Sequence, residues 1–278
     1  MDFNVVEAVR SRRSVRSFDG VALSEEDRRA VIDYVNNTMT PFSVPLCFRM
    51  LDHAGAERNE KLDTKGIVTG TELYLAITVP KSAPMNLEAA GYAFEQLVLY
   101  AASRGIGTTI IAGTMDRVGF ERAVHLAADE VMPVMTPLGR AGKPTLRERA
   151  MRRAIKADSR RDWSELFFDG DFSTPLSKEA AGAYQEALEC VRLAPSAVNA
   201  QPWLVLREGK SFHFFERHGR GFGKDPAADI QRVDMGIACC HFDLAAQEAG
   251  LHGHWEHRPP ALSLPENTDY CISYLAEE

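Results

Sequence analysis

The sequence lacks the features that mark membrane proteins, disulfide-rich proteins and secreted precursors. No stretch approaches the roughly 18 consecutive apolar residues of a membrane-spanning helix. The five cysteines are odd in number and contain no Cys-x-x-Cys pair, which is typical of a reduced compartment rather than of a disulfide framework. The N-terminus carries acidic residues and has neither the basic nor the long apolar region of a signal peptide. We therefore expect a cytoplasmic protein that does not contact membranes.

The sequence also lacks an excess of positive charge. Lys and Arg number 32 against 39 Asp and Glu, for a formal net charge of −7. This balance argues against a dedicated nucleic-acid binder, so we expect no nucleic-acid partner. About 45% of the 278 residues are apolar. That share excludes disorder as the main state and is enough for a core of ordinary size without a metal or disulfide.

Short motifs recur in the two halves of the chain, in the same order and about half the chain apart. The pairs are Phe18-Asp19-Gly20 with Phe168-Asp169-Gly170, Leu23-Ser24-x-Glu26 with Leu176-Ser177-x-Glu179, Gly91-x-Ala93 with Gly236-x-Ala238, and Gly105-Ile106 with Gly250-Leu251. Chance could produce any one match, but their common order favours a degenerate internal duplication. We place the first half at residues 1–165 and the second half at residues 166–278.

The pattern of apolar residues predicts both helices and strands. Helices are expected over 3–12, 24–37, 87–103, 177–193 and 231–249, and strands over 43–52, 72–80, 131–136, 203–208, 211–216 and 269–275, with a further short strand starting at Ile110-Ile111. Strands do not alternate regularly with single helices. The pattern therefore favours an α+β fold over a doubly wound parallel sheet.

The first polar motif is Arg12-Arg13-Ser14-Val15-Arg16, where the first predicted helix ends and an extended segment begins. Three guanidiniums and a hydroxyl within five residues could bind a phosphate, because the planar fork of arginine matches phosphate oxygens. A solvated basic helix end, favoured by the helix dipole, explains the same residues when they are considered alone.

The second polar motif covers residues 194–203, after one predicted helix and before a strand. Two prolines stiffen this segment, and Ser196, Asn199 and Gln201 supply hydrogen-bonding groups. Such a loop suits the polar edge of a planar heterocycle. An ordinary capped turn is the alternative, and Trp203 is expected in the core.

Together, Arg-Arg-Ser-Val-Arg-x-Phe and Ala-Pro-Ser-Ala-x-Asn-x-Gln-Pro-Trp resemble the FMN-dependent nitroreductase family, and the resemblance covers essentially the whole chain. Pro137-Leu138-Gly139 and Ser159-Arg160-Arg161 add to it. The resemblance implies a nitroreductase-like α+β fold with two pseudo-symmetric halves, each a sheet flanked by helices. It also implies an FMN oxidoreductase that takes hydride from NAD(P)H and passes electrons to a nitroaromatic, quinone or similar small acceptor in a ping-pong cycle. A flavin-binding protein with little or no turnover is the alternative.

The resemblance also implies roles for individual residues. The phosphate and ribityl chain of FMN would be bound by Arg12, Arg13, Ser14, Arg16 and Arg160, and the ring would be lined by Pro195, Ser196, Ala197 and Asn199. Gly113 and Thr114 match a loop whose backbone N–H groups lie near the reactive nitrogen of the flavin. No catalytic side chain and no metal ligand is expected.

The order of the motifs differs from the common family pattern, in which both lie in one short chain that dimerises. Here the arginine motif stands only in the first half and the Pro-Ser motif only in the second. At the matching first-half position, residues 40–47, Pro45 replaces Asn199 and Cys47 replaces Gln201. This resembles a fused pseudo-dimer in which one of two flavin sites has been erased. A monomer should then be competent, while a further homodimer is not forbidden.

Four other features are better explained without a ligand. His252, His254 and His257 lack a carboxylate or cysteine at zinc-site spacing. Cys239-Cys240 lies within a buried-helix pattern, and the Lys- and Arg-rich residues 140–161 are expected to form a solvated crossover that carries Arg160. The glycine-rich residues 219–224 match neither nucleotide-binding loop pattern and predict a hairpin or surface loop.

Overall fold

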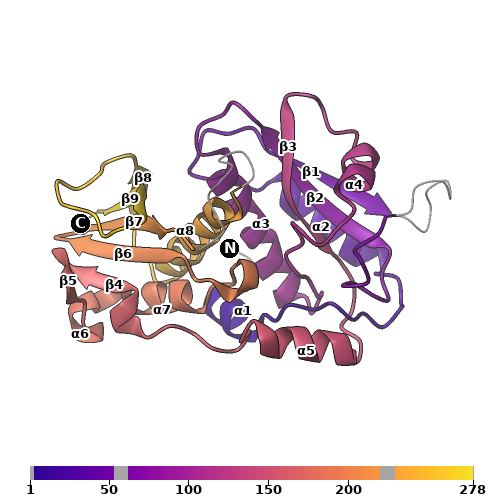
Figure 1. Ribbon diagram of the computed structural model, residues 1–278, viewed down its shortest axis with the longest axis horizontal. Coiled ribbons are helices and arrows are strands. Elements are labelled where there is room, and N and C mark those ends of the chain that lie inside the picture. Colours follow the sequence, from indigo (N-terminus) through magenta and orange to yellow (C-terminus); the bar gives the residue numbers. More distant parts are fainter. Residues whose placement is uncertain (1–2, 53–61, 220–228, 278) are drawn as a thin grey trace.

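The computed structural model describes residues 3–52, 62–219 and 229–277, so most of the glycine-rich segment at 219–224 lies outside the described residues. Two sheets lie at opposite ends of the molecule, with helices α3 (Asn86–Ser103) and α8 (Ile230–Glu248) between them (Figure 1). This arrangement confirms the expected α+β class with two halves. Within the described ranges, no helix is long and apolar enough to cross a membrane.

The first half contains a three-stranded antiparallel sheet of order β1-β2-β3. Its strands are β1 (Cys47–Asp52), β2 (Leu73–Pro80) and β3 (Glu130–Pro137). The helices of this half are α1 (Val5–Ser11), α2 (Glu25–Asn36), α3 and the short α4 (Arg117–Ala123). The side chain of Ser24 accepts a hydrogen bond from the Asp27 N–H and so caps α2, as its position before an acidic first turn predicts.

The second half contains a six-stranded sheet of order β5-β4-β6-β7-β9-β8, in which only the β4–β6 pair is parallel. Its strands are β4 (Phe167–Asp169), β5 (Asp171–Pro175), β6 (Trp203–Glu208), β7 (Ser211–Arg217), β8 (Gly253–Glu256) and β9 (Thr268–Ala276). Helices α6 (Lys178–Ala181), α7 (Gln185–Leu193) and α8 accompany it, and α5 (Leu146–Ala154) lies on the crossover between the halves.

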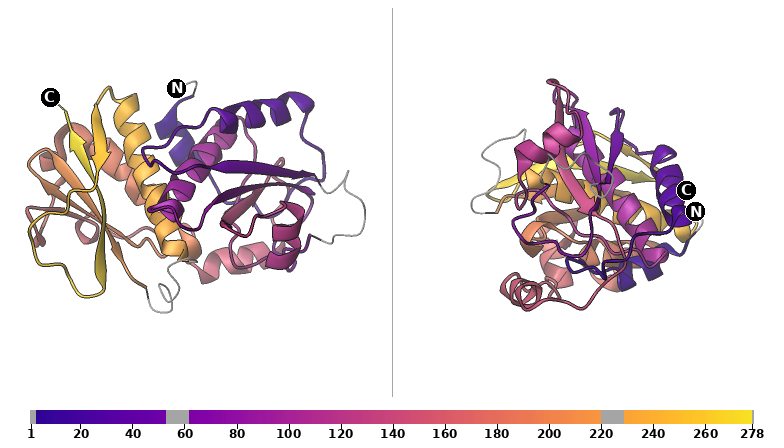
Figure 2. Two further views of the ribbon diagram at one scale, coloured as in Figure 1. Left: turned by 90° about the horizontal axis from the view of Figure 1, so that it is seen from above. Right: turned by 90° about the vertical axis from the view of Figure 1, so that its right-hand side faces the viewer.

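The two central helices pack against each other through a symmetric pair of glycines. A Cβ atom at Gly91 would lie 2.0 Å from the Val233 carbonyl oxygen, and one at Gly236 would lie 2.0 Å from the Glu88 carbonyl oxygen. Each carbonyl belongs to the residue three positions before the opposite glycine. Only glycine permits this close approach, so the repeated glycine marks the point where α3 and α8 cross (Figure 2).

The ends of the central helices repeat as well. Gly105 and Gly250 have φ angles of +68° and +74°, and each directly precedes an N–H that bonds back to a carbonyl five residues earlier. A residue with a positive φ ends the helix at this position without backbone strain only when it is glycine. By contrast, Phe168 pairs in parallel with β6, whereas Phe18 bridges Ala141 in antiparallel fashion. The pseudo-symmetry therefore holds for the central helices and not for every repeated motif.

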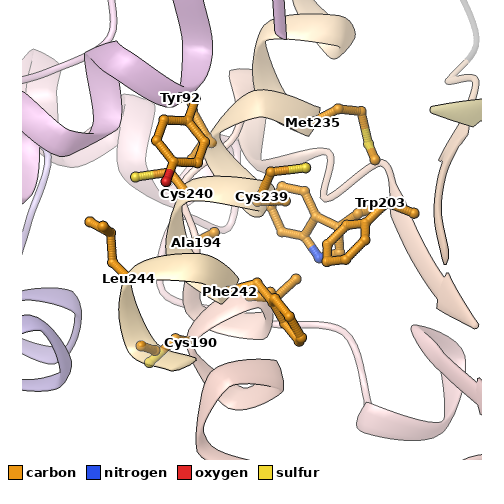
Figure 3. Close-up of a cluster of buried hydrophobic side chains, with 14 of the residues drawn as sticks. Tyr92, Cys190, Ala194, Trp203, Met235, Cys239, Cys240, Phe242 and Leu244 are labelled. Carbon is orange, nitrogen blue, oxygen red and sulfur yellow. The ribbon is translucent and has the colours of Figure 1, made fainter. Parts of the chain in front are cut away.

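The main core lies around α8, between the two halves (Figure 3). Cys239 and Cys240 are fully buried beside Tyr92 of α3, and Trp203 of β6 is also fully buried. The Tyr92 hydroxyl donates a hydrogen bond to Asp243 across the helix pair (2.6 Å). The cysteines and Trp203 are thus packing residues, as predicted.

Two predicted elements are wrong in detail. The expected strand at Ile110-Ile111 is a single bridge, in which Ile111 and Met135 exchange hydrogen bonds of 2.9 and 3.0 Å. The next pairing positions along β3 are Pro133 and Pro137, which have no N–H to donate, so the pairing cannot extend. The expected helix over 177–193 is broken by a 3₁₀ turn at Gly182–Tyr184, where Gly182 has a φ of +58°.

Candidate active site

A cavity of about 590 Å³ lies between the two halves and is lined by both. It falls within the 300–1,000 Å³ typical of ligand pockets. Every residue predicted to bind flavin lines it except Arg13, namely Arg12, Ser14, Arg16, Gly113, Thr114, Arg160, Pro195, Ser196, Ala197 and Asn199. Their role in flavin binding stays a prediction, but the fold brings them together from distant parts of the chain.

The arginine motif faces the cavity because of its extended backbone. Helix α1 ends at Ser11, and Ser14 forms a parallel bridge with Thr108. In extended chain, alternate residues point to the same side, so Arg12, Ser14 and Arg16 share the cavity wall. Arg13 points away: it is exposed, and its guanidinium donates only to the carbonyls of Arg10 and Arg12. Arg13 therefore belongs to the motif but not to the cavity.

Three arginines that line the cavity, Arg12, Arg16 and Arg160, form no ion pair within the described residues. Arg12 Nε and Arg16 Nη1 are buried and make no hydrogen bond there. Burial lowers the pKa of both guanidiniums, and burial together with the charge of Arg12 lowers the pKa of Arg160 to about 10. All three stay charged at neutral pH. Half-buried cations that repel one another favour a nearby counter-charge, so the arrangement at this end of the cavity can accept an anion.

Arg160 and Asn199 connect the crossover segment to the Pro-Ser loop. Arg160 donates to the Leu193 carbonyl (3.0 Å) and weakly to Asn199 Oδ1 (3.4 Å). The Asn199 side-chain amide donates to the carbonyls of Lys156 and Ser159 at 2.8 and 3.1 Å. The amide of Asn199 thus holds the wall of the cavity in place, rather than pointing its donors at a ring edge as the sequence suggested.

The Pro-Ser loop has a strained backbone. Val198, Asn199 and Gln201 have φ angles of +47°, +59° and +50°. For a β-branched residue such as Val198 this conformation is a genuine outlier, and such strain clusters at ligand sites. Two further contacts help to hold the loop: Ser196 Oγ accepts from the Gln201 N–H (2.9 Å), and the Ala197 N–H donates to the carboxyl of Asp234 (2.9 Å).

Asp234 is a loop anchor that sequence reasoning missed. It lies on α8, is completely buried, and its pKa is raised well above the usual range by that burial. A protonated carboxyl still accepts the Ala197 N–H through its carbonyl oxygen. An Asp within the buried stretch of a central helix is the signal in the sequence that could have indicated it, because buried acids are rare without a partner.

The cavity lining also includes residues with unpaired polar groups and apolar side chains. The N–H groups of Gly113 and Thr114 donate to no group in the described part of the chain. The Oγ1 atom of Thr109 is buried, also unpartnered, and lines the same cavity. The remaining lining includes residues that no sequence motif indicated, among them Arg117, Met151, Ile155, Asp229, Ile230 and Val233.

The matching loop of the first half is built differently and lines none of this cavity. Its Phe42 is 8% exposed and packs edge-on against Tyr92 in the central core, with 6.0 Å between ring centroids. By the alignment of Pro41 with Pro195, Phe42 stands where the second half has Ser196. A phenyl ring therefore fills the space at the position that offers a hydroxyl on the other side.

Comparisons with known proteins agree on one family. The family model described as "Putative TM nitroreductase" matches residues 4–246. A crystal structure described as a putative nitroreductase from Thermotoga maritima is 19% identical, covers 99% of this chain and 94% of its own, and has a TM-score of 0.61. Similarity at this identity concerns the fold.

Two shorter structures match about half of the chain. A nitroreductase family protein from Clostridium novyi NT is 20% identical, with 51% of this chain and 87% of its own covered and a TM-score of 0.41. One from Clostridium difficile 630 is 14% identical, with 54% and 92% covered and a TM-score of 0.43. No curated protein matches the chain. Because the family model spans most of the sequence, the chain belongs to the nitroreductase family.

Proposed function

We propose that the cavity binds FMN and that the protein is an oxidoreductase that uses NAD(P)H to reduce a small acceptor such as a nitroaromatic or a quinone. The observation that carries this proposal is the group of half-buried guanidiniums of Arg12, Arg16 and Arg160, which converge without an anion. A terminal phosphate would supply the missing charge, and each hydrogen bond between charged groups contributes about 1.5–3 kcal/mol.

The other walls fit the rest of the molecule. The apolar side chains of Ile230 and Val233 and the Pro-Ser loop would contact a planar ring and exclude water from it. The free N–H groups of Gly113 and Thr114 would donate to the polar edge of the ring and stabilise negative charge that develops there. When bound, FMN supplies the acceptance of hydride and the release of electrons, so no acid, base or nucleophile of the protein is assigned.

The test begins with the purified protein. We expect it to be yellow and to release one FMN per chain on denaturation, and to oxidise NADH or NADPH steadily when a quinone is added. Colourless protein that takes up no FMN on reconstitution would refute the cofactor. Tightly bound FMN without steady turnover would favour the alternative of a flavin-binding protein and refute the oxidoreductase.

A further inference from the structure

A second group of chemistry-bearing side chains lies where β7 ends and α8 begins. Glu216 and His218 lie at the end of β7, and Asp229 precedes the first turn of α8. One ligand atom from each of these side chains lies within 4.8 Å of the other two. Asp229 also lines the cavity described above, so the cluster adjoins that cavity. The proposed flavin chemistry uses none of the three residues.

The cluster holds buried polar atoms that face each other without bonding. Glu216 and Asp229 are each only 6% exposed. Glu216 Oε1 and His218 Nδ1 are 2.9 Å apart and form an ion pair only when His218 is protonated; both are buried atoms without a hydrogen-bond partner among the described residues. Ligand atoms this close to each other, with one from Asp229 within 4.8 Å, can share a cation.

His218 is oriented from its far side. Its Nε2 lies 2.7 Å from Asp269 Oδ2, and the exposed carboxylate of Asp269 accepts the ring N–H there. In the neutral imidazole, an N–H at Nε2 leaves Nδ1 with a lone pair that can bind a cation. Carboxylates that orient histidines in this way are typical of metal sites, and His218 itself is 28% exposed, which gives a cation a path from solvent.

We propose that Glu216, His218 and Asp229 form a binding site for a divalent transition-metal cation such as Zn²⁺. Two carboxylates and one imidazole are a suitable ligand set for borderline cations, and three protein ligands leave a fourth position for water or for a donor group of a bound molecule. A dication would also offset the repulsion between the two buried carboxylates. Arg232 acts on Glu216 as well, but its guanidinium makes two hydrogen bonds of 2.8 Å to Glu88.

The alternative is that a proton replaces the metal, with a protonated His218 lying between Glu216 and Asp269. A direct experiment on the unaltered protein separates the two. Protein treated with EDTA and dialysed is titrated with Co²⁺, whose visible absorption reports its coordination, first with and then without bound FMN. We expect one Co²⁺ per chain, displaced by Zn²⁺, and a rise in melting temperature with Zn²⁺. Absence of Co²⁺ absorption at sub-millimolar concentrations would overturn the site, whatever the flavin content.

Variants then locate the metal. His218→Gln and Glu216→Gln should each weaken Co²⁺ binding by at least about 100-fold, and Asp269→Asn by about 10- to 100-fold, because removing an orienting carboxylate costs that much. His254→Gln is the matched control, since His254 also lies near two carboxylates, at 3.9 Å, but is exposed. Its Co²⁺ affinity should equal that of the unaltered protein. Equal losses in His254→Gln and His218→Gln, or no loss in the ligand variants, would overturn the assignment.

Discussion

The two halves of the molecule contain corresponding loops that differ in structure and surroundings. The second-half loop, residues 194–202, has a strained backbone, borders the cavity and is anchored by Asp234. The first-half loop, residues 40–47, buries Phe42 against Tyr92 and borders no part of that cavity. The residue two positions before the crossing glycine differs correspondingly: it is Asp234 before Gly236 but Ala89 before Gly91.

On the proposed duplication, this difference shows how a site could be lost while its fold is kept. The crossing of α3 and α8 and the glycine ends of both helices are nearly identical in the two halves. The differences lie in the loop and at one helix position. The first-half loop has a phenyl ring in place of a hydroxyl, and its helix has a methyl group in place of the anchoring carboxyl. Close-packed helices tolerate little change, whereas loops on a fixed scaffold tolerate much.

The largest expected effect concerns the charge at the one intact site. Arg12→Ala combined with Arg16→Ala should weaken FMN binding about a hundred- to ten-thousand-fold, since each charged hydrogen bond contributes about 1.5–3 kcal/mol. Arg13→Ala is the matched control, because Arg13 belongs to the same motif but faces solvent. Flavin fluorescence titration measures both. Equal affinities in the double variant and the control would contradict the phosphate role.

The next effect tests whether the first-half loop is now part of the core. Phe42→Ala should destabilise the protein by about 3 kcal/mol, at the low end for a buried phenylalanine because the ring is 8% exposed. Urea unfolding followed by circular dichroism measures the free energy of unfolding. The flavin content should stay at one per chain, because the first-half loop still has Pro45 and Cys47 in place of Asn199 and Gln201 and the second half has no arginine motif. Two FMN per chain would show that Phe42 alone had closed a second site.

A smaller effect is expected when the second half is made to resemble the first at the loop anchor. Asp234→Ala removes the acceptor of the Ala197 N–H and leaves that part-buried donor without its partner, which costs up to about 1–3 kcal/mol and should weaken FMN binding about tenfold or more. Asp234→Asn keeps an acceptor of the same shape and should restore most of the affinity. If Asn and Ala weaken binding equally, the hydrogen bond is not what holds the loop.

The last prediction is that dilution of the protein has no effect on its affinity for FMN. Both the arginine motif and the Pro-Ser loop line one cavity within a single chain, so the affinity for FMN should not change when the protein is diluted well below any dimer dissociation constant. Fluorescence of bound flavin across a dilution series, compared with the oligomeric state from light scattering, makes the measurement. Release of flavin in step with dissociation of a dimer would contradict the fused arrangement.

The sequence predicted the fold class and the two polar motifs because both depend on local patterns. Apolar periodicity placed α3, α8 and the main strands within a few residues of their observed bounds. The short strands β4 and β8 and the helices α4 and α5 were not predicted, because partners such as β6 lie far away in the sequence; β5, which pairs with the adjacent β4, was not predicted either. Pro133 and Pro137 show the same limit: their effect on Ile111 depends on a pairing register that is absent from the sequence.

The sequence by itself determined which residue types are available: the arginines around Ser14, the stiff polar loop after Ala194, and the repeated glycines at the helix crossing and helix ends. Tertiary structure decided what these residues do. In the folded chain Arg13 faces solvent, and the Asn199 amide binds the crossover segment. Asp234 anchors the Pro-Ser loop, and Glu216, His218 and Asp229 lie close together. The physical reason is that local backbone preference fixes which side chains alternate, whereas burial, charge repulsion and hydrogen-bond partners arise only where distant segments meet.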